Sequence, residues 1–311
     1  MNPVNLRIGT RGSALALYQT NLVKRLLETA CPGSTLEIVT IKTTGDRNQQ
    51  RPVNPLETKR VFTREIEAAL AAGEVHLAVH SAKDVAVVMP EGLITGAVLE
   101  REDPRDCLLT PDSRKLEDLL PGSRIGTSAL RRKTQLLNRF PALQVEDLQG
   151  NVDTRLRKMM EGGYDAIVLA YAGVKRLGLT ARVSEILNEE TFYPAPGQGA
   201  ILVQCREEDG ETREALKRIH HAESGLRLDC ERSFLRHLEG GCQLPCGLWT
   251  RLQDGGITAA GVLLSLDGLE RVEARLETAS DHPHQAGVKL ADLLLNQGGD
   301  RILEKIRRQS S

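Results

Sequence analysis

The stretch RIGTRGSALAL (residues 7–17) has a shorter counterpart later in the chain, RIGTSALRR (residues 124–132). In each copy a short apolar run leads through a turn into a segment of helical periodicity, which predicts a strand followed at once by a helix. Arginine side chains stand beside both turns, at Arg11 and at Arg131 and Arg132. Four shared letters can arise by chance, but the shared order of strand, turn and helix favours two related α/β lobes.

The first lobe continues from this strand as alternating strands and helices. Ser13 stands where a helix N-cap is expected. The helix that follows would bury the stripe formed by Leu15, Tyr18, Leu22 and Leu26. Its remaining elements are expected as strands at 36–41 and 75–80 and a helix at 62–73.

The second lobe repeats the pattern after residue 124. Its further elements are expected as a helix through Phe140, a strand at 143–148, a helix at 152–161 and a strand at 165–170. The run ILVQCR (201–206) predicts a strand that returns to the first lobe and completes a two-stranded hinge. We therefore expect residues 1–99 and 200–217 to form lobe 1, and residues 100–199 to form lobe 2.

The C-terminal part of the chain, residues 218–311, has a different pattern. A helix is expected at 223–238, and the turns DGG (254–256) and DG (267–268) indicate hairpins between strands. A final helix over about 285–308 would complete a small α+β domain.

Composition excludes several classes of protein. The 41 basic and 42 acidic residues nearly balance, so no global field marks a nucleic-acid or membrane partner. Aromatic residues make up 3% of the chain, which leaves few platforms for stacking bases. We see no secretory signal and no apolar run of the roughly 18–20 residues that a membrane span needs. Six cysteines in such a chain are expected as free thiols, and the protein is expected to be soluble and cytoplasmic.

The loop GGCQLPCG (240–247) places Cys242 and Cys246 four residues apart. This spacing differs from the CxxC of zinc ribbons and redox motifs, although a metal site with the upstream histidines or a redox pair is conceivable. Cys246, between proline and glycine, is expected to be a small buried residue. Cys242 follows two glycines, so its thiol can be exposed, which suits a covalent attachment point.

Two further features suggest a site for an anion. The segment HSAKDV (80–85) puts Lys83 and Asp84 at the carboxyl end of a strand, where open α/β sheets bind ligands; a solvated ion pair is the plainer interpretation. Arginines near predicted strand-to-helix turns could all face one cleft between the lobes, and they favour a polycarboxylate because no phosphate-binding loop is present. These are Arg11, Arg131, Arg132, Arg155 and Arg176.

These pieces together resemble the porphobilinogen deaminase family over nearly the whole chain. The motifs that carry the resemblance are RIGTRGSALAL, VHLAVHSAKDV, EREDPRD, GTSALRR, GNVDTRL, YDAIVLAYAGVKRLGL, PAPGQGA and LRHLEGGC. The resemblance implies an α/β fold of two periplasmic-binding-protein-like (type II) lobes with a small α+β C-terminal domain. It implies a monomeric transferase of tetrapyrrole biosynthesis, which joins four porphobilinogen molecules head to tail, releases ammonia and yields hydroxymethylbilane.

The resemblance also implies a dipyrromethane cofactor, held by a thioether bond to Cys242, and neither a metal nor a nucleotide. Asp84 matches the catalytic aspartate of the family, with Lys83 beside it. The cofactor would be bound by Ser13, Lys83, Asp84, Thr127, Ser128, Arg131, Arg132 and Arg155. The substrate would be bound by Arg11, Ser13, Arg155, Arg176, Gln149 and Gln198.

The chain departs from the family pattern at three places. Gln149 replaces a typical arginine and supplies no charge, and Ala129 replaces a common serine. The segment PLETKRVF (55–62) replaces a glycine-rich lid segment while keeping Lys59. These departures leave open a slow or repurposed paralogue, or a two-lobed module that binds a small anion without turnover.

Overall fold

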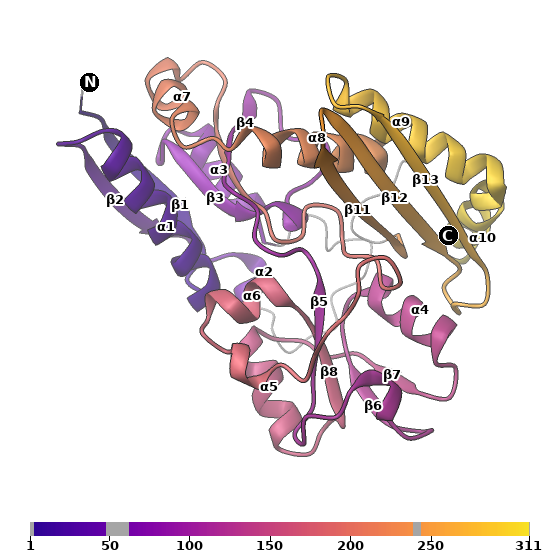
Figure 1. The fold of residues 1–311 in the computed structure, drawn as a ribbon. Coiled ribbons are helices and arrows are strands. Elements are labelled where there is room, and N and C mark those ends of the chain that lie inside the picture. The colour runs from indigo at the N-terminus through magenta and orange to yellow at the C-terminus, as the bar shows by residue number, and fades with distance from the viewer. Residues whose placement is uncertain (1–2, 48–61, 239–243, 311) are drawn as a thin grey trace. The chain divides into compact units, whose positions relative to one another are not determined.

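The computed structural model describes residues 3–47, 62–238 and 244–310 (Figure 1). The chain forms two compact units, residues 1–102 with 199–226 and residues 103–198 with 227–311. The predicted lobes therefore fall in different units, whereas the division into three domains stays a prediction. Within the described ranges, every helix is too short or too polar to cross a lipid bilayer.

The first unit contains a five-stranded sheet in the order β2-β1-β3-β10-β4. β1 runs parallel to β2 and β3, whereas β10 is antiparallel to both β3 and β4. The strands are β1 (Asn5–Thr10), β2 (Thr35–Thr40), β3 (Leu77–Ser81), β4 (Leu93–Val98) and β10 (Ile201–Arg206). The strand predicted at 201–206 thus returns to this sheet, as expected.

Helix α1 (Ala14–Ala30) begins where the sequence predicts, because the Ser13 hydroxyl accepts a hydrogen bond from the amide of Ala16 at 3.3 Å. The predicted buried stripe is only partly right, because Leu22 packs partly buried against the core but Leu26 is 37% exposed. Val23 and Leu27 are fully buried against the sheet, whereas Tyr18 is 40% exposed. Both stripes have helical spacing, so periodicity alone did not show which of them faces the strands. The unit's other helices are α2 (Thr44–Arg47), α3 (Arg64–Ala71) and α7 (Gly210–Lys217).

The second unit holds a sheet of the same design, in the order β7-β6-β8-β5-β9. β6 is parallel to β7 and β8, and β5 is antiparallel to β8 and β9. The strands are β5 (Asp106–Leu109), β6 (Arg124–Gly126), β7 (Gln144–Glu146), β8 (Ala166–Ala170) and β9 (Glu185–Ile186). The two copies of RIGT occupy the equivalent strands β1 and β6, which confirms that the lobes are related and confirms the expected fold class.

Helices follow the parallel strands of the second sheet, as the alternating pattern predicts. They are α4 (Leu130–Arg139) after β6, α5 (Val152–Met160) after β7 and α6 (Tyr171–Arg176) after β8. Two apolar clusters pack on this sheet, one that includes Leu136 of α4 and one that includes Met159 of α5.

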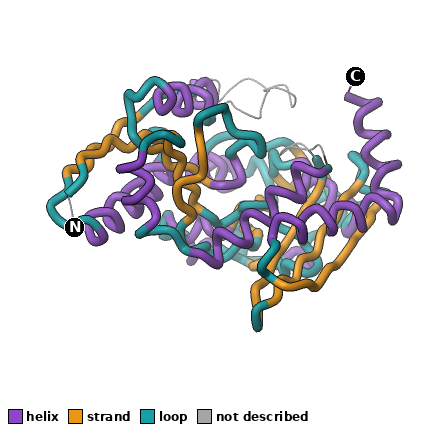
Figure 2. The backbone as a smooth tube through the Cα atoms, turned by 90° about the horizontal axis from the view of Figure 1, so that it is seen from above, coloured by secondary structure: helices purple, strands orange, loops and turns teal. Residues whose placement is uncertain are grey.

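The C-terminal part forms an antiparallel meander of β11 (Cys246–Gln253), β12 (Gly256–Leu264) and β13 (Arg271–Ala279). Helices α8 (Ala222–His237) and α9 (Pro283–Leu294) pack on the sheet at Gly261, where an added Cβ would lie 3.1 Å from Phe234 of α8 and 3.5 Å from Leu290 of α9. The single predicted final helix is wrong: a break at Leu295–Gly299, with Gly298 at φ +105°, separates α9 from α10 (Asp300–Ser310; Figure 2). The predicted hairpin at 254–256 is confirmed, since Asp254 and Gly255 both have positive φ.

His80, near the end of β3, belongs to a buried polar cluster with Gln204 and Glu67. Strand alternation puts His80 on the same face as Ala78, which packs against α3. Burial lowers the pKa of His80, the side chain of Gln204 raises it and the charge of Arg11 lowers it, and the net result is a pKa of about 4. Gln204, itself fully buried, donates to the carboxylate of Glu67 at 3.2 Å. His80 is therefore neutral in the folded protein at pH 7.

This burial predicts acid lability. Between pH 6.5, the ordinary pKa, and about 4, the unfolded chain binds a proton at His80 that the folded chain does not, so stability falls as the pH is lowered. At about 1.4 kcal/mol per pKa unit, His80 would cost roughly 3 kcal/mol over this window. Urea unfolding of the wild type and His80→Gln at several pH values measures the effect. The variant should show a shallower pH slope, and exposed His282→Gln should not; an unchanged slope in His80→Gln would refute the assignment.

Candidate active site

In the first unit, predicted site residues follow the carboxyl ends of two neighbouring parallel strands. Arg11 and Ser13 follow β1, and Lys83 and Asp84 follow β3. Parallel neighbours end at the same edge of a sheet, so the fold brings these four residues to one edge, where open α/β sheets bind ligands.

The turn after β3 presents Lys83 and Asp84. It is a single turn of 3₁₀ helix, Ala82–Asp84, in which successive side chains point about 120° apart. The amide of Ala82 donates to the carbonyl of Ala200 at 3.0 Å, which fixes the turn to β10. Asp84 is exposed and Lys83 is half-buried. Adjacent residues in a strand point in opposite directions, but this turn allows Lys83 and Asp84 to face the same ligand.

The side chain of Arg11 stacks on an aromatic ring. Its guanidinium carbon lies 4.2 Å from the centroid of the Phe62 ring, the last residue of the segment expected to act as a lid. Such stacking orients a guanidinium plane. The rest of that segment, residues 55–61, lies outside the described residues.

In the second unit, Thr127 and Ser128 follow β6. Thr127 is buried, and its hydroxyl accepts from the amide of Ala129 at 3.3 Å, whereas Ser128 is exposed. Ala129 occupies the N-cap position of α4, so this helix begins without a side-chain cap. The departure from the family pattern at Ala129 therefore leaves α4 without a hydroxyl that could cap it.

A carboxylate that the sequence did not single out holds the two arginines of α4. Asp106, with none of its side chain exposed, accepts from Arg131 Nη1 at 2.7 Å and from Arg132 Nε at 2.9 Å. Burial alone would raise the pKa of Asp106, but the charges of Arg131 and Arg132 outweigh burial and lower it to about 2. Burial lowers the pKa of Arg131, yet a guanidinium stays charged at neutral pH.

Further contacts engage most donors of Arg132. Its Nη1 donates to the carbonyl of Val168 at 3.0 Å, and its Nη2 lies 2.8 Å from Asp106. Gln198, which is 1% exposed, donates to Asp106 at 2.9 Å and to the carbonyl of Pro104 at 2.7 Å. The structure thus brings Arg132 and Gln198 together, but both bind the carboxylate of Asp106, whereas the sequence predicts that they bind carboxylates of a ligand.

The loop after β7 carries Gln149, whose amide donates to Asp147 at 2.8 Å. Arg155 Nε donates to the carbonyl of Gly150 at 2.7 Å, and Lys158 Nζ donates to the carbonyl of Gln149 at 3.1 Å. Gly150 has φ +115°, and a Cβ there would lie 2.8 Å from Thr154, so the turn requires glycine. Two cations of α5 therefore hold this loop.

Arg176 differs from the other predicted arginines. It is the last residue of α6, five residues beyond the strand-to-helix turn rather than next to it. The expectation that every arginine stands at such a turn is wrong for this one, because the short α6 separates it from β8.

Cys242 lies outside the described residues, so its role stays a prediction. The five other cysteines are free and buried. Burial raises the pKa of Cys107 and Cys230 to about 12 and that of Cys205 to about 11. Cys246 is 3% exposed at the start of β11, as expected for a packing residue. Thiols of this kind are poor nucleophiles.

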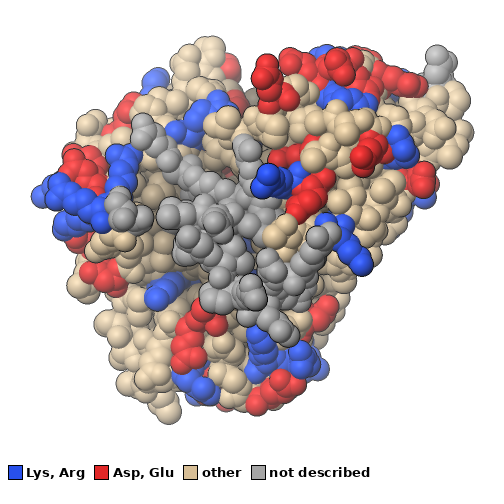
Figure 3. All heavy atoms as spheres, turned by 180° about the vertical axis from the view of Figure 1, so that it is seen from behind, with Lys and Arg blue, Asp and Glu red and all other residues tan. Residues whose placement is uncertain are grey.

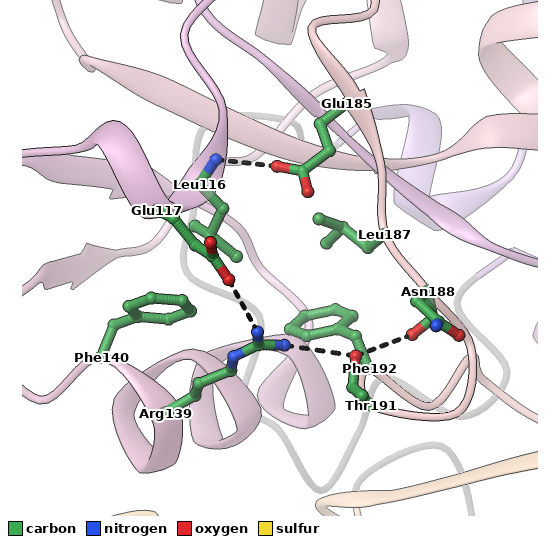
Figure 4. A pocket seen from close by; sticks show the side chains of 9 residues that line it. All are labelled: Leu116, Glu117, Arg139, Phe140, Glu185, Leu187, Asn188, Thr191 and Phe192. Atoms are coloured by element: carbon green, nitrogen blue, oxygen red, sulfur yellow. Dashed lines mark hydrogen bonds and ion pairs between the residues drawn. The ribbon is translucent and has the colours of Figure 1, made fainter.

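A pocket of about 200 Å³ lies at the other end of α4 (Figure 4). Arg139, which lines it, is about 12 Å along the helix from Arg131, given a rise of 1.5 Å per residue. Its guanidinium pairs with Glu117 at 3.0 Å, and Glu185 adds a second carboxylate. Two acidic groups against one paired arginine do not suit a polycarboxylate, so this pocket is separate from the candidate site.

Charge elsewhere on the surface is mixed. Figure 3 shows acidic and basic side chains interspersed over the described surface of one face. The cationic groups at the strand ends are therefore a local feature rather than part of a broad basic surface.

Comparison with known proteins identifies the family. The model of the porphobilinogen deaminase dipyromethane cofactor binding domain matches residues 6–214, and that of the porphobilinogen deaminase C-terminal domain matches residues 226–296. Porphobilinogen deaminase from Syntrophobacter fumaroxidans is 45% identical over 97% of this chain and 98% of its own, and that from Syntrophomonas wolfei is 46% identical over 98% and 99%. Among solved structures, a putative methionine-binding lipoprotein from Bacillus subtilis aligns with 71% of this chain and 92% of its own, at 12% identity and a TM-score of 0.44.

The Asp106 network predicts a large stability effect. Asp106→Asn keeps the shape but leaves two buried guanidiniums without a counter-charge, so we expect the free energy of unfolding to fall by about 3–5 kcal/mol. Asp112→Asn, which removes an exposed partner of Arg114, should cost less than about 1 kcal/mol. Chemical denaturation of both variants at pH 7 gives the comparison, and equal small losses would show that Asp106 does not hold the arginines.

Proposed function

The chain belongs to the porphobilinogen deaminase family, and we propose that the residues at its two sheet edges carry out that family's reaction. The protein is a transferase that joins four porphobilinogen molecules head to tail, releases ammonia at each addition and gives hydroxymethylbilane. Its cofactor is a dipyrromethane. Family membership does not favour the alternative of an anion-binding module without turnover.

The observation that carries the residue assignment is the position of Asp84. It is an exposed carboxylate on the 3₁₀ turn that follows β3, next to Lys83 and on the same sheet edge as Arg11. The turn holds this carboxylate at a fixed point of the edge. Asp84 is thus suited to meet cationic or N–H groups of a pyrrole.

Asp84 would act on the charge that develops in the reaction. Loss of ammonia from the aminomethyl group of porphobilinogen leaves a positive charge spread over its pyrrole ring. An adjacent carboxylate stabilises that charge and accepts hydrogen bonds from pyrrole N–H groups. The free α-carbon of the terminal pyrrole attacks the methylene carbon of that cation, and after the new carbon–carbon bond has formed this α-carbon loses its proton, which the carboxylate can help to transfer. Lys83 would bind a substrate carboxylate beside it.

The bound dipyrromethane supplies the free pyrrole α-carbon to which the first substrate unit is joined. The residues present fit such a group, because each pyrrole bears two carboxylates and both sheet edges end in cations and hydroxyls. We assign cofactor binding to Ser13, Lys83, Asp84, Thr127, Ser128, Arg131, Arg132 and Arg155. We assign substrate binding to Arg11, Ser13, Gln149, Arg155, Arg176 and Gln198.

The buried network refines two of these assignments. Nη1 of Arg131 donates to Asp106 at 2.7 Å and to the carbonyl of Tyr193 at 2.6 Å, and we assign contact with a ligand carboxylate to the rest of its guanidinium. Arg132 is engaged through all three of its nitrogens. In our proposal Arg131 contacts a carboxylate directly, and Arg132 and Gln198 mainly hold it in place. The protein would work as a monomer in the cytoplasm.

Covalent attachment through Cys242 has a direct test. Protein purified from cells that make porphobilinogen should be heavier than its sequence by one dipyrromethane, and Cys242→Ser should lack the added mass. Cys246→Ala, a change at a buried thiol, should retain it. Intact-mass spectrometry makes the measurement, and a folded wild type without added mass, or an adduct that survives Cys242→Ser, would contradict the assignment.

The role of Asp84 predicts a loss of turnover without a loss of fold. Asp84→Asn removes the charge from an exposed side chain, so stability should change little while kcat falls by about 10²-fold or more. Glu91→Gln, at another exposed carboxylate of the same unit, serves as the control. Ammonia release and thermal unfolding are compared, and near-normal turnover of Asp84→Asn would overturn its role.

A further inference from the structure

The segment Tyr193–Gln198 connects several elements of the second unit, because these elements form hydrogen bonds with its backbone. The carbonyl of Tyr193 accepts from Arg131 of α4 at 2.6 Å, and its amide donates to Gln135 at 2.7 Å. The amide of Leu248 in β11 donates to the carbonyl of Pro194 at 2.9 Å. The segment therefore connects α4 to the C-terminal sheet.

A buried carboxylate on α8 makes another short contact with this segment. Glu231, with no exposed surface, accepts from the amide of Gly197 at 2.6 Å through one oxygen and from the hydroxyl of Thr250 at 2.6 Å through the other. Arg227 of α8 also donates to that hydroxyl, at 3.3 Å. A carboxylate accepts such bonds strongly when it is desolvated, so Glu231 fastens α8 to the segment.

Gln198, the residue after Gly197, connects this segment to the pair of arginines. Gln198 follows Gly197 and donates to Asp106, the carboxylate that holds Arg131 and Arg132. One peptide bond therefore separates the contact with α8 from the network of α4. Gly197 has φ +76°, a conformation that glycine adopts without strain, and this conformation sets the direction in which Gln198 leaves the turn.

We propose that Glu231 is a positioning residue that couples α8 to Arg131 and Arg132 through the Tyr193–Gln198 segment. α8 ends at His237, five residues before Cys242 in the sequence. α8, the helix that precedes the cysteine loop in the sequence, is thereby fixed in position relative to Arg131 and Arg132. Its consequence for the cofactor rests on the proposed function: displaced arginines would bind cofactor carboxylates less well.

The charge of Glu231 can be removed while its size is kept. In Glu231→Gln the amide oxygen can still accept from the Gly197 amide, although this hydrogen bond is no longer charge-assisted. The amide nitrogen then faces the Thr250 hydroxyl, which must turn to accept a hydrogen bond instead of donating one. Exchange of a charge-assisted bond for a neutral one should speed hydrogen exchange of the Gly197 amide about tenfold. If coupling holds, protection should also fall in the first two turns of α4, residues 130–135.

The matched control is Ser233→Ala. Ser233 is also buried on α8, but its hydroxyl donates to the carbonyl of Cys230 within the helix and lies on the side that meets α9 at Gly287. Its loss should weaken the helix without reaching the Tyr193–Gln198 segment. Thr250→Val provides a second, milder change at the same carboxylate.

Hydrogen exchange and intact mass are measured on the full-length proteins, each with and without the cofactor. The proposal expects faster exchange at 193–198 and at 130–135, and a lower fraction carrying the dipyrromethane, in Glu231→Gln but not in Ser233→Ala. Faster exchange confined to 193–198, or the same pattern in Ser233→Ala, would overturn it. A wild type without adduct would count against the proposed function, and the exchange comparison would still decide the coupling.

Discussion

A fully buried carboxylate organises the second unit. An ionised Asp106 is tolerated inside the protein because two guanidiniums and the amide of Gln198 compensate for its lost hydration. Asp106 in turn supplies the counter-charge of both buried arginines. The strand β5, the helix α4 and the turn before Gly199 are thereby held by one group of charges. The ligand contacts that we propose for the α4 arginines depend on this group.

The two units carry different candidate site residues. The edge of the first sheet carries the exposed Asp84 together with cations from β1 and β3, whereas the edge of the second carries hydroxyls and arginines, some of which already neutralise Asp106. A polymer with two carboxylates on every pyrrole needs many cationic partners but a single group for bond formation. In our proposal, Asp84 is the one reactive carboxylate and the arginines bind the carboxylates of the polymer.

Much of this arrangement could be predicted from local signals. The two RIGT strands, the Ser13 cap, the hairpin at Asp254 and the buried Cys246 each depend on a few neighbouring residues, and the structure confirms them. The errors have a common cause. The buried stripe of α1, the break at Gly298 and the place of Arg176 at the end of α6 depend on what each helix packs against or where it stops, which periodicity alone does not show.

The sequence by itself determined the family, the reaction, the alternation of elements and the candidate residues at strand ends, because motifs and turn residues are local. Only the tertiary structure decided which charges meet. Asp106 lies 25 residues from Arg131 in the chain, and Glu231 lies 34 residues from Gly197, yet each pair is in hydrogen-bond contact. A buried carboxylate takes its partners from whatever the fold brings within about 3 Å, and the order of residues does not contain that distance.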